Sequence, residues 1–393
     1  MSPASFVLAH AANSDWQFAL ARARGELQSQ IAERHSRHPD ARPFTLGWCY
    51  LCDYYADEAE AILSALQAEF PNVSWVGTSA LGVSATGVEY FDEPALVLML
   101  APLPRTAFRL FSGLQPLPMH PTDFPAHTAL VHAEGSTPDV QELLQELAAR
   151  TTTGYLFGGL SSARDRTLHI ADHVLTGGLS GVAFGPEVDL ISRVTQGCQP
   201  IGALRTITGS EDNYVLRLDG RPALACLLDD LGLDTELPTE EMLEALSGTL
   251  VGLSTGPSDV TAHPGQFGPD TLVRHLIGVD PQNQVLAIGD EVAEGMHLAF
   301  CTRDARAARA DLVRIALEIR TELAGSGKAI AGALYVSCSG RGGPHFGGPH
   351  AELQTVRDVL GDVPLAGFFA GGEIARDRLY GYTGVLTAFA MPE

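Results

Sequence analysis

Residues 363–375 read "VPLAGFFAGGEIA", and the glycines in this stretch decide the fold. Glycine weakens a β-strand unless the chain bends there or another group comes close to its backbone. The same glycine-punctuated pattern occurs twice more, as "VSWVGTSALGV" at residues 73–83 and "GYLFGGLSSA" at residues 154–163. The recurrence indicates a structural unit that is present in three copies.

Each copy places the same elements around its glycine strand. An apolar strand comes first and an amphipathic helix follows it, then the glycine strand and a further apolar strand. The first strands read "FTLGWCYLCD", "TALVHAEG" and "AGALYVSCSG". We therefore expect an α/β (α+β) fold with two domains, built from repeated strand–helix–strand–strand units whose helices cover β-sheets.

The composition narrows the class of protein. The chain has 393 residues, of which 45% are hydrophobic, enough for more than one buried core, and its net charge is −22. The excess of acidic residues argues against nucleic acid or an anionic membrane surface as a partner. Its first residues lack the basic start of a signal peptide, and its six scattered cysteines suggest reduced thiols, so we expect a cytoplasmic protein.

The loop "SCSGRGGPHFGGPHAE" at residues 337–352 is the stretch with the most chemical character. It follows a predicted strand and precedes a predicted helix, where backbone N–H groups and the helix dipole favour an anion. Arg341 would add a bidentate contact to a carboxylate or phosphate. No lysine follows the glycines, so the loop is not a phosphate-binding P-loop, and a plain connector is the alternative.

Cys338 stands where this strand meets the loop. One hypothesis makes it a thiolate nucleophile with His345 or His350 as the base. The other treats it as a small buried side chain, facing a ligand without reacting. We expect no metal and no cofactor. The pair Cys49 and Cys52 lies on one predicted strand, where residues three apart face opposite sides. This placement argues against a shared metal or redox function for the two cysteines.

Glu373 follows two glycines directly, and a carboxylate in that place needs water, a cation or a ligand amine. Arg341, from the same copy, could be a purely structural partner for it. The bare backbone of the glycine strand would let a ligand come close. Asn213 or Tyr214 could close such a pocket from the segment between the second and third copies.

These motifs resemble the FIST family. The resemblance rests on "WVGTSALGV", "TQGCQPIG", "SCSGRGG", "VPLAGFFAGGEI" and "YGYTGVLTAF" and covers roughly residues 30–389. It implies a FIST N-terminal domain at 30–205, with two units, and a FIST C-terminal domain at 206–389, with the third. Sensory relatives often repeat the "GEI" turn in the first half, where this chain has Val83.

The resemblance implies an intracellular sensory module that binds small ligands, with amino acids suspected, and acts on signalling partners. We expect a cytoplasmic small-ligand sensor and not an enzyme, acting through an unidentified signalling protein, with an amino acid or other small carboxylate as ligand. The alternatives are a cysteine-dependent hydrolase or acyltransferase and a protein–protein scaffold like the F-box-associated relatives. The expected ligand contacts are Thr78, Ser79, Asn213, Cys338, Arg341, Gly342, Glu352, Gly367, Gly371, Gly372 and Glu373.

Overall fold

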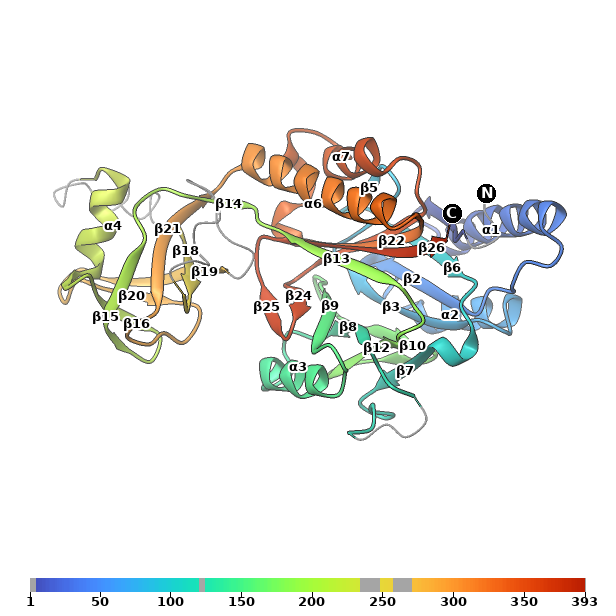
Figure 1. Ribbon diagram of the computed structural model, residues 1–393, viewed down its shortest axis with the longest axis horizontal. Coiled ribbons are helices and arrows are strands. Elements are labelled where there is room, and N and C mark those ends of the chain that lie inside the picture. The colour runs from blue at the N-terminus through green and yellow to red at the C-terminus, as the bar shows by residue number, and fades with distance from the viewer. Residues whose placement is uncertain (1–4, 120–123, 234–247, 257–270, 393) are drawn as a thin grey trace. The chain divides into compact units, whose positions relative to one another are not determined.

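The computed structural model describes residues 5–119, 124–233, 248–256 and 271–392 (Figure 1). Two compact units share the chain: unit 1 contains Met1–Thr195 and Leu312–Glu393, and unit 2 contains Gln196–Asp311. The boundary expected at residues 205–206 divides the sequence into two segments, which are not the same as the two compact units. In space the third repeat belongs to the same unit as the first two, and unit 2 is inserted between them in the chain.

Unit 1 confirms the three repeats and the mixed α/β class. In each repeat a helix connects two parallel strands, and a later strand pairs antiparallel with the first of them. The three sets are β2 (Leu46–Cys52), α2 (Ala59–Glu69), β3 (Ser74–Ala80) and β6 (Ala95–Ala101); β8 (Thr128–Ala133), α3 (Val140–Ala149), β9 (Tyr155–Leu160) and β12 (Leu179–Phe184); and β22 (Lys328–Cys338), α7 (Ala351–Leu360), β23 (Leu365–Ala370) and β26 (Gly384–Pro392).

The repeats also exchange hairpins in a cycle. The hairpin of the first repeat pairs with β23, that of the second with β3, and that of the third with β9. These hairpins are β4 (Gly82–Ala85) and β5 (Val88–Phe91), β10 (His169–Ala171) and β11 (Val174–Leu175), and β24 (Glu373–Arg376) and β25 (Arg378–Tyr380). Edge strands β1 (Val7–Ala12), β7 (Phe108–Ser112) and β13 (Leu190–Thr195) complete three six-stranded sheets.

The glycines that mark the repeats make room for a neighbouring strand. A Cβ atom would lie 1.8 Å from a backbone carbonyl oxygen at Gly77, and 2.0 Å from one at Gly158 and at Gly367. In each repeat the carbonyl belongs to the parallel partner strand. The close approach that we assigned to a ligand at Gly367 is therefore made by the protein's own backbone, which is a correction.

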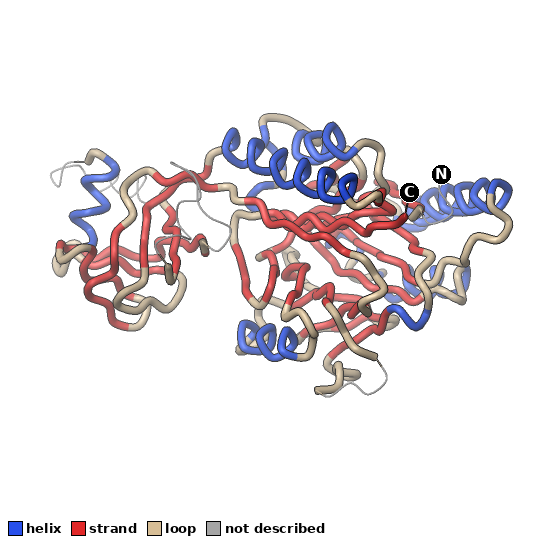
Figure 2. The backbone as a smooth tube through the Cα atoms, in the orientation of Figure 1, coloured by secondary structure: helices blue, strands red, loops and turns tan. Residues whose placement is uncertain are grey.

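Aromatic side chains from all three sheets meet in the core of unit 1. The ring of Tyr50 lies 5.1 Å from that of Phe368 and 5.6 Å from that of His132, and His132 lies 5.6 Å from Phe368. The helices take the outer faces, where α2 and α1 (Trp16–Arg37) bury the first sheet. Figures 1 and 2 show α7, together with the unit-1 part of α6 (Ala305–Gly325), along the sheet that contains β22 and β26.

Unit 2 is an antiparallel sheet closed on itself, because β18 pairs with both β19 and β21. Its core gathers side chains such as Leu227, Leu286 and Phe300. The elements are β14 (Cys198–Pro200), β15 (Arg205–Glu211), β16 (Tyr214–Leu218), β17 (Arg221–Pro222), α4 (Ala223–Leu231), β18 (Leu250–Ser254), β19 (Leu272–Asp280), β20 (Val285–Ile288) and β21 (His297–Arg303). Within the described parts of the chain, the helices are too short or too polar to cross a membrane.

Candidate functional site

Arg341 lies in the loop between β22 and α7, and it is paired inside the protein. The loop forms two short 3-10 turns, Ser339–Arg341 and Gly343–Phe346, and leaves the Arg341 side chain 1% exposed. Its Nη2 lies 2.8 Å and its Nε 3.0 Å from Oε1 of Glu352, which is fully buried. The carboxylate that Arg341 contacts is therefore that of Glu352 in the following helix, and both contacts go to one of its oxygens.

Hydroxyl groups complete this ion pair. Tyr335 donates to Glu352 Oε1 at 2.7 Å, Ser337 Oγ lies 3.0 Å from both carboxylate oxygens, and Arg341 donates to Thr195 Oγ1 at 3.3 Å. Burial alone would lower the pKa of Arg341, but Tyr335 and Glu352 raise it above its usual value. The guanidinium thus stays charged and satisfied, as a buried ion pair requires.

Glu89 connects the first repeat to the N-terminus of α7. Its Oε1 accepts from the backbone N–H groups of Glu352 at 2.9 Å and Leu353 at 3.0 Å, and its own N–H donates to His350 Nδ1. Burial raises the pKa of Glu89 to about 7, with the Glu352 charge adding to the rise and the Leu353 N–H opposing it. His350 is therefore part of a capping arrangement at a helix N-terminus.

Glu373 is the one charged group of this region with an unsatisfied atom among the described residues. It is fully buried at the start of β24, and its Oε2 accepts from the Thr383 N–H at 3.0 Å and the Thr383 hydroxyl at 2.7 Å. Its Oε1 has no partner in hydrogen-bond geometry. Burial raises the pKa of Glu373 to about 7, although the hydrogen bonds from Thr383, the Arg341 charge and the Cys338 thiol act to lower it.

Cys338 ends β22 beside Glu373. Burial raises the pKa of its thiol to about 12, and the Glu373 charge adds to this, while the N–H groups of Gly340 and Tyr382 oppose it. A thiol with such a raised pKa is a poor nucleophile at neutral pH. His350 bonds to Glu89, and His345 packs edge-on against Phe346. This geometry argues against the hydrolase alternative.

Thr78 and Ser79, expected to contact a ligand, instead hold a loop of the second repeat. Thr78 Oγ1 donates to the Leu168 carbonyl at 2.9 Å and lies 2.7 Å from Ser161 Oγ. Ser79 Oγ accepts from the Leu168 N–H at 3.0 Å. Both hydroxyls are buried and engaged.

The turns after the three glycine strands bond to one another. Ser162 Oγ donates to the Phe369 carbonyl at 2.6 Å and accepts from the Leu81 N–H at 3.0 Å, which joins all three repeats. The Gly371 N–H donates to the Leu160 carbonyl at 3.0 Å, and the Leu160 N–H to the Gly372 carbonyl at 2.8 Å. The turns therefore converge as expected, but they contact each other directly.

Three other expected contacts lie in different surroundings. A Cβ atom at Gly342 would come within 2.2 Å of the Phe91 ring, so that glycine accommodates an aromatic side chain. Gly371 is exposed, and a Cβ atom there would meet nothing nearer than 3.5 Å. Asn213 lies in unit 2 and donates to the Ile288 carbonyl at 3.0 Å, so its contribution to a ligand site stays a prediction.

The strand register shows what is particular to the third repeat. Val83, His169 and Glu373 occupy equivalent positions, each opposite the residue that follows the marker glycine of its sheet. His169 is a buried sheet residue, bonded to Ser180 Oγ at 2.6 Å and to the Gly177 carbonyl at 2.9 Å. Only the third repeat puts a carboxyl group there.

Comparison with known proteins places the chain in a family. Residues 45–221 match the FIST N domain, and residues 223–376 match the FIST C domain. The chain is a FIST protein. FIST domains are in general sensory domains of signal transduction.

Two relatives of this FIST protein have names that state no activity. An uncharacterized protein of Mycobacterium tuberculosis (strain CDC 1551 / Oshkosh) is 33% identical over 360 residues, which cover 85% of this chain and 88% of the relative. An uncharacterized protein of Mycobacterium bovis is 32% identical over 362 residues, with the same coverage.

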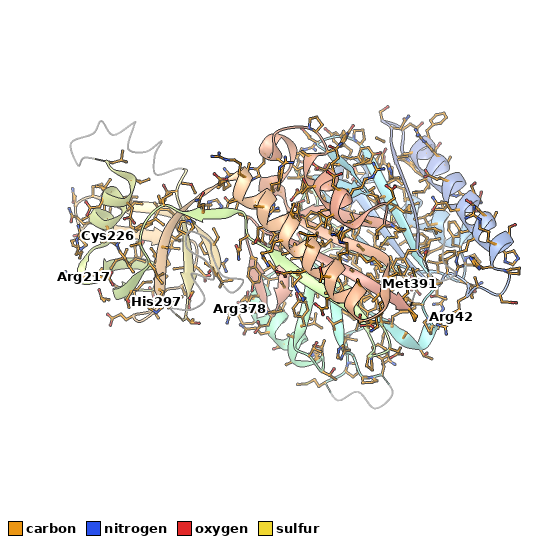
Figure 3. The ribbon with its side chains drawn as sticks, turned by 45° about the horizontal axis from the view of Figure 1, so that its top comes forward. Arg42, Arg217, Cys226, His297, Arg378 and Met391 are labelled. Carbon is orange, nitrogen blue, oxygen red and sulfur yellow. The ribbon has the colours of Figure 1, made fainter. Side chains whose placement is uncertain are left out.

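Three hollows of unit 1 have walls that do not include Glu373. Their volumes are about 620, 390 and 580 Å³, and none of the three is lined by Cys338, Arg341 or Glu373. Arg42 and Met391, both labelled in Figure 3, line the third of them. Within the described ranges no group of three His, Cys, Asp or Glu side chains could hold a metal ion.

Proposed function

We propose that this FIST protein is a sensor for a small molecule with an ammonium group, an amino acid by class, and that Glu373 receives that group. The observation that carries the proposal is the buried Glu373 Oε1, which no described residue meets in hydrogen-bond geometry. The neighbouring Cys338 thiol, which helps to lower the pKa of Glu373, is a weak donor that a ligand N–H would outcompete. A buried acceptor without a donor costs about 1–3 kcal/mol, and a ligand N–H would recover this. The ammonium charge would also favour the ionised carboxylate.

Arg341 has a supporting role in this proposal. Its three guanidinium nitrogens already contact Glu352, Thr195 and Tyr335, so a ligand carboxylate would have to displace Glu352. Its charge nevertheless lowers the pKa of Glu373. Arg341 therefore biases the ligand-binding carboxyl towards its ionised form without gripping the ligand.

Binding requires a rearrangement, which suits a sensor. Gly371 is exposed two residues before the buried Glu373, and the loop that covers Arg341 contains Gly347 and Gly348, where an added Cβ atom would meet nothing within 4 Å. A ligand that reaches Oε1 would displace this loop, which leads directly into α7. Ligand binding would thus favour a second arrangement of α7, which a separate signalling protein could recognise.

A thermal-shift comparison tests the proposal. Alanine has both an ammonium group and a carboxylate, propionate has the carboxylate alone, and ethylamine has the amine alone. A wider panel of amino acids with their deaminated acids extends the comparison. A ligand at 100 times its Kd stabilises by about 2.7 kcal/mol, or roughly 5 °C for a unit of this size. We expect shifts only with ammonium-bearing compounds, lost in Glu373→Gln and kept in the exposed control Glu60→Gln. Equal shifts with the deaminated acids, or none with any compound, would remove the proposal.

A further inference from the structure

A hollow of about 620 Å³ lies at the ends of α1 and α2, far in sequence from the Glu373 region. Its walls are mainly apolar and include Ile31, Phe44, Phe70 and Pro71. Small-molecule sites commonly have volumes of about 300–1,000 Å³, with apolar walls and a few polar groups. The hollow therefore has the size and lining of a ligand site.

Cationic side chains surround this apolar surface. Arg34 is 4% exposed, its guanidinium lies 4.6 Å from the centre of the Phe44 ring, and its Nη1 donates to the Arg42 carbonyl at 3.0 Å. That bond fixes the segment after α1, which carries Arg42 (Figure 3). The Arg42 side chain is exposed and has no ion pair with any described residue. The guanidinium of Arg42 is thus available to an anion.

The acidic group that lines the hollow is already neutralised. Glu69 accepts hydrogen bonds from Arg24 and Gln28, which hold its carboxylate at the end of α2. Two arginine side chains beside an apolar hollow are unexpected on a protein with a net charge of −22. Arginine binds carboxylates through paired hydrogen bonds, and an apolar wall selects ligands with a hydrophobic body.

We propose that this hollow is a binding site for a small amphipathic carboxylate. The hydrophobic body of the ligand lies against Phe44 and Phe70, and its carboxylate faces Arg42. The site is separate from Glu373 and takes a ligand that is recognised by an anionic head and an apolar tail, not by an ammonium group. The protein would then bind a second kind of small molecule, in addition to the ligand proposed at Glu373.

Isothermal titration with three probes tests the site. Decanoate carries both features, decanol lacks the charge, and acetate lacks the apolar body; decanoate is kept below its micelle concentration. We expect decanoate to bind and the other two to bind at least about tenfold more weakly, because decanol lacks the hydrogen bonds to a charged group and acetate lacks the apolar surface that the walls would bury. 2-Naphthoate in place of decanoate decides between an aromatic and an aliphatic body.

Matched variants locate the binding. Arg42→Gln should weaken decanoate affinity about tenfold or more, whereas Arg37→Gln, at the end of α1, paired with Glu33 and outside the hollow, should leave it unchanged. Ala32→Phe, at an exposed position of the lining, should block the hollow without disturbing the core. The proposal is overturned if decanol binds as tightly as decanoate, if both arginine variants lose affinity equally, if Ala32→Phe binds normally, or if decanoate does not bind.

Discussion

Replacing Glu373 by glutamine should stabilise unit 1 at alkaline pH and leave it unchanged at acidic pH. Burial raises the pKa of this carboxyl from its ordinary 4.5 to about 7 in the folded protein. Between these two values the folded state holds the proton more tightly than the unfolded chain does. The free energy of unfolding therefore falls as pH rises through this window, and the loss is complete above pH 7.

The size of the effect follows from the pKa shift. One pKa unit corresponds to about 1.4 kcal/mol, so a rise from 4.5 to about 7 costs the folded protein about 3 kcal/mol at pH 8. Glutamine keeps the shape and carries no charge, so Glu373→Gln should unfold with a free energy up to about 3 kcal/mol higher than the wild type at pH 8. At pH 4 the two proteins should be equal within about 0.5 kcal/mol.

Tryptophan fluorescence reports this change for unit 1 alone, because all three tryptophans (Trp16, Trp48 and Trp75) lie in that unit. Urea unfolding at pH 4, 6 and 8 gives the difference between variant and wild type, and Glu60→Gln serves as the exposed control. Glu89 also has a raised pKa, so the free energy of unfolding of both proteins still changes with pH. Only the difference in this free energy between the variant and the wild type reports on Glu373. A difference that does not change between pH 4 and pH 8 would refute the reasoning.

Three further predictions concern the strands and the loop. Gly367→Ala should destabilise unit 1 by about 3 kcal/mol or more in urea unfolding, since its Cβ would lie 2.0 Å from a carbonyl oxygen, whereas Gly371→Ala should change little; equal effects would contradict the packing argument. Native Cys338 should react with iodoacetamide at pH 8 at least about a hundredfold more slowly than in urea, as mass spectrometry would show, and fast native labelling would revive the nucleophile hypothesis. Arg341→Met should cost about 3–5 kcal/mol and Arg341→Met with Glu352→Gln clearly less, because the single change leaves a buried charge unpaired; a double variant as unstable as the single one would contradict this.

The sequence predicted the repeats well because they are local patterns. The five-residue spacing from Gly77 to Gly82 and from Gly367 to Gly372 marks the same strand and turn in two copies, and the register confirms Val83 as the counterpart of Glu373. The exchange of hairpins could not be predicted, because strand partners from different repeats have no signal in spacing or periodicity.

The same limit explains the errors at the candidate site. Arg341 and Glu352 were both recognised as important, but their burial as a pair depends on Thr195 and Tyr335, which the fold brings together. Glu89 was missed altogether. Its contact with α7 joins residues that are more than 260 positions apart in the chain.

The carboxyl carbon of Glu373, followed by ¹³C NMR through a pH titration with and without the ammonium ligand found by thermal shift, tests the account most directly. We predict a midpoint near pH 7 for the free protein, and a clearly lower midpoint with ligand, because a bound ammonium group stabilises the carboxylate. A midpoint near 4.5 that the ligand leaves unchanged would contradict both the buried, unsatisfied state of Glu373 and its role in binding.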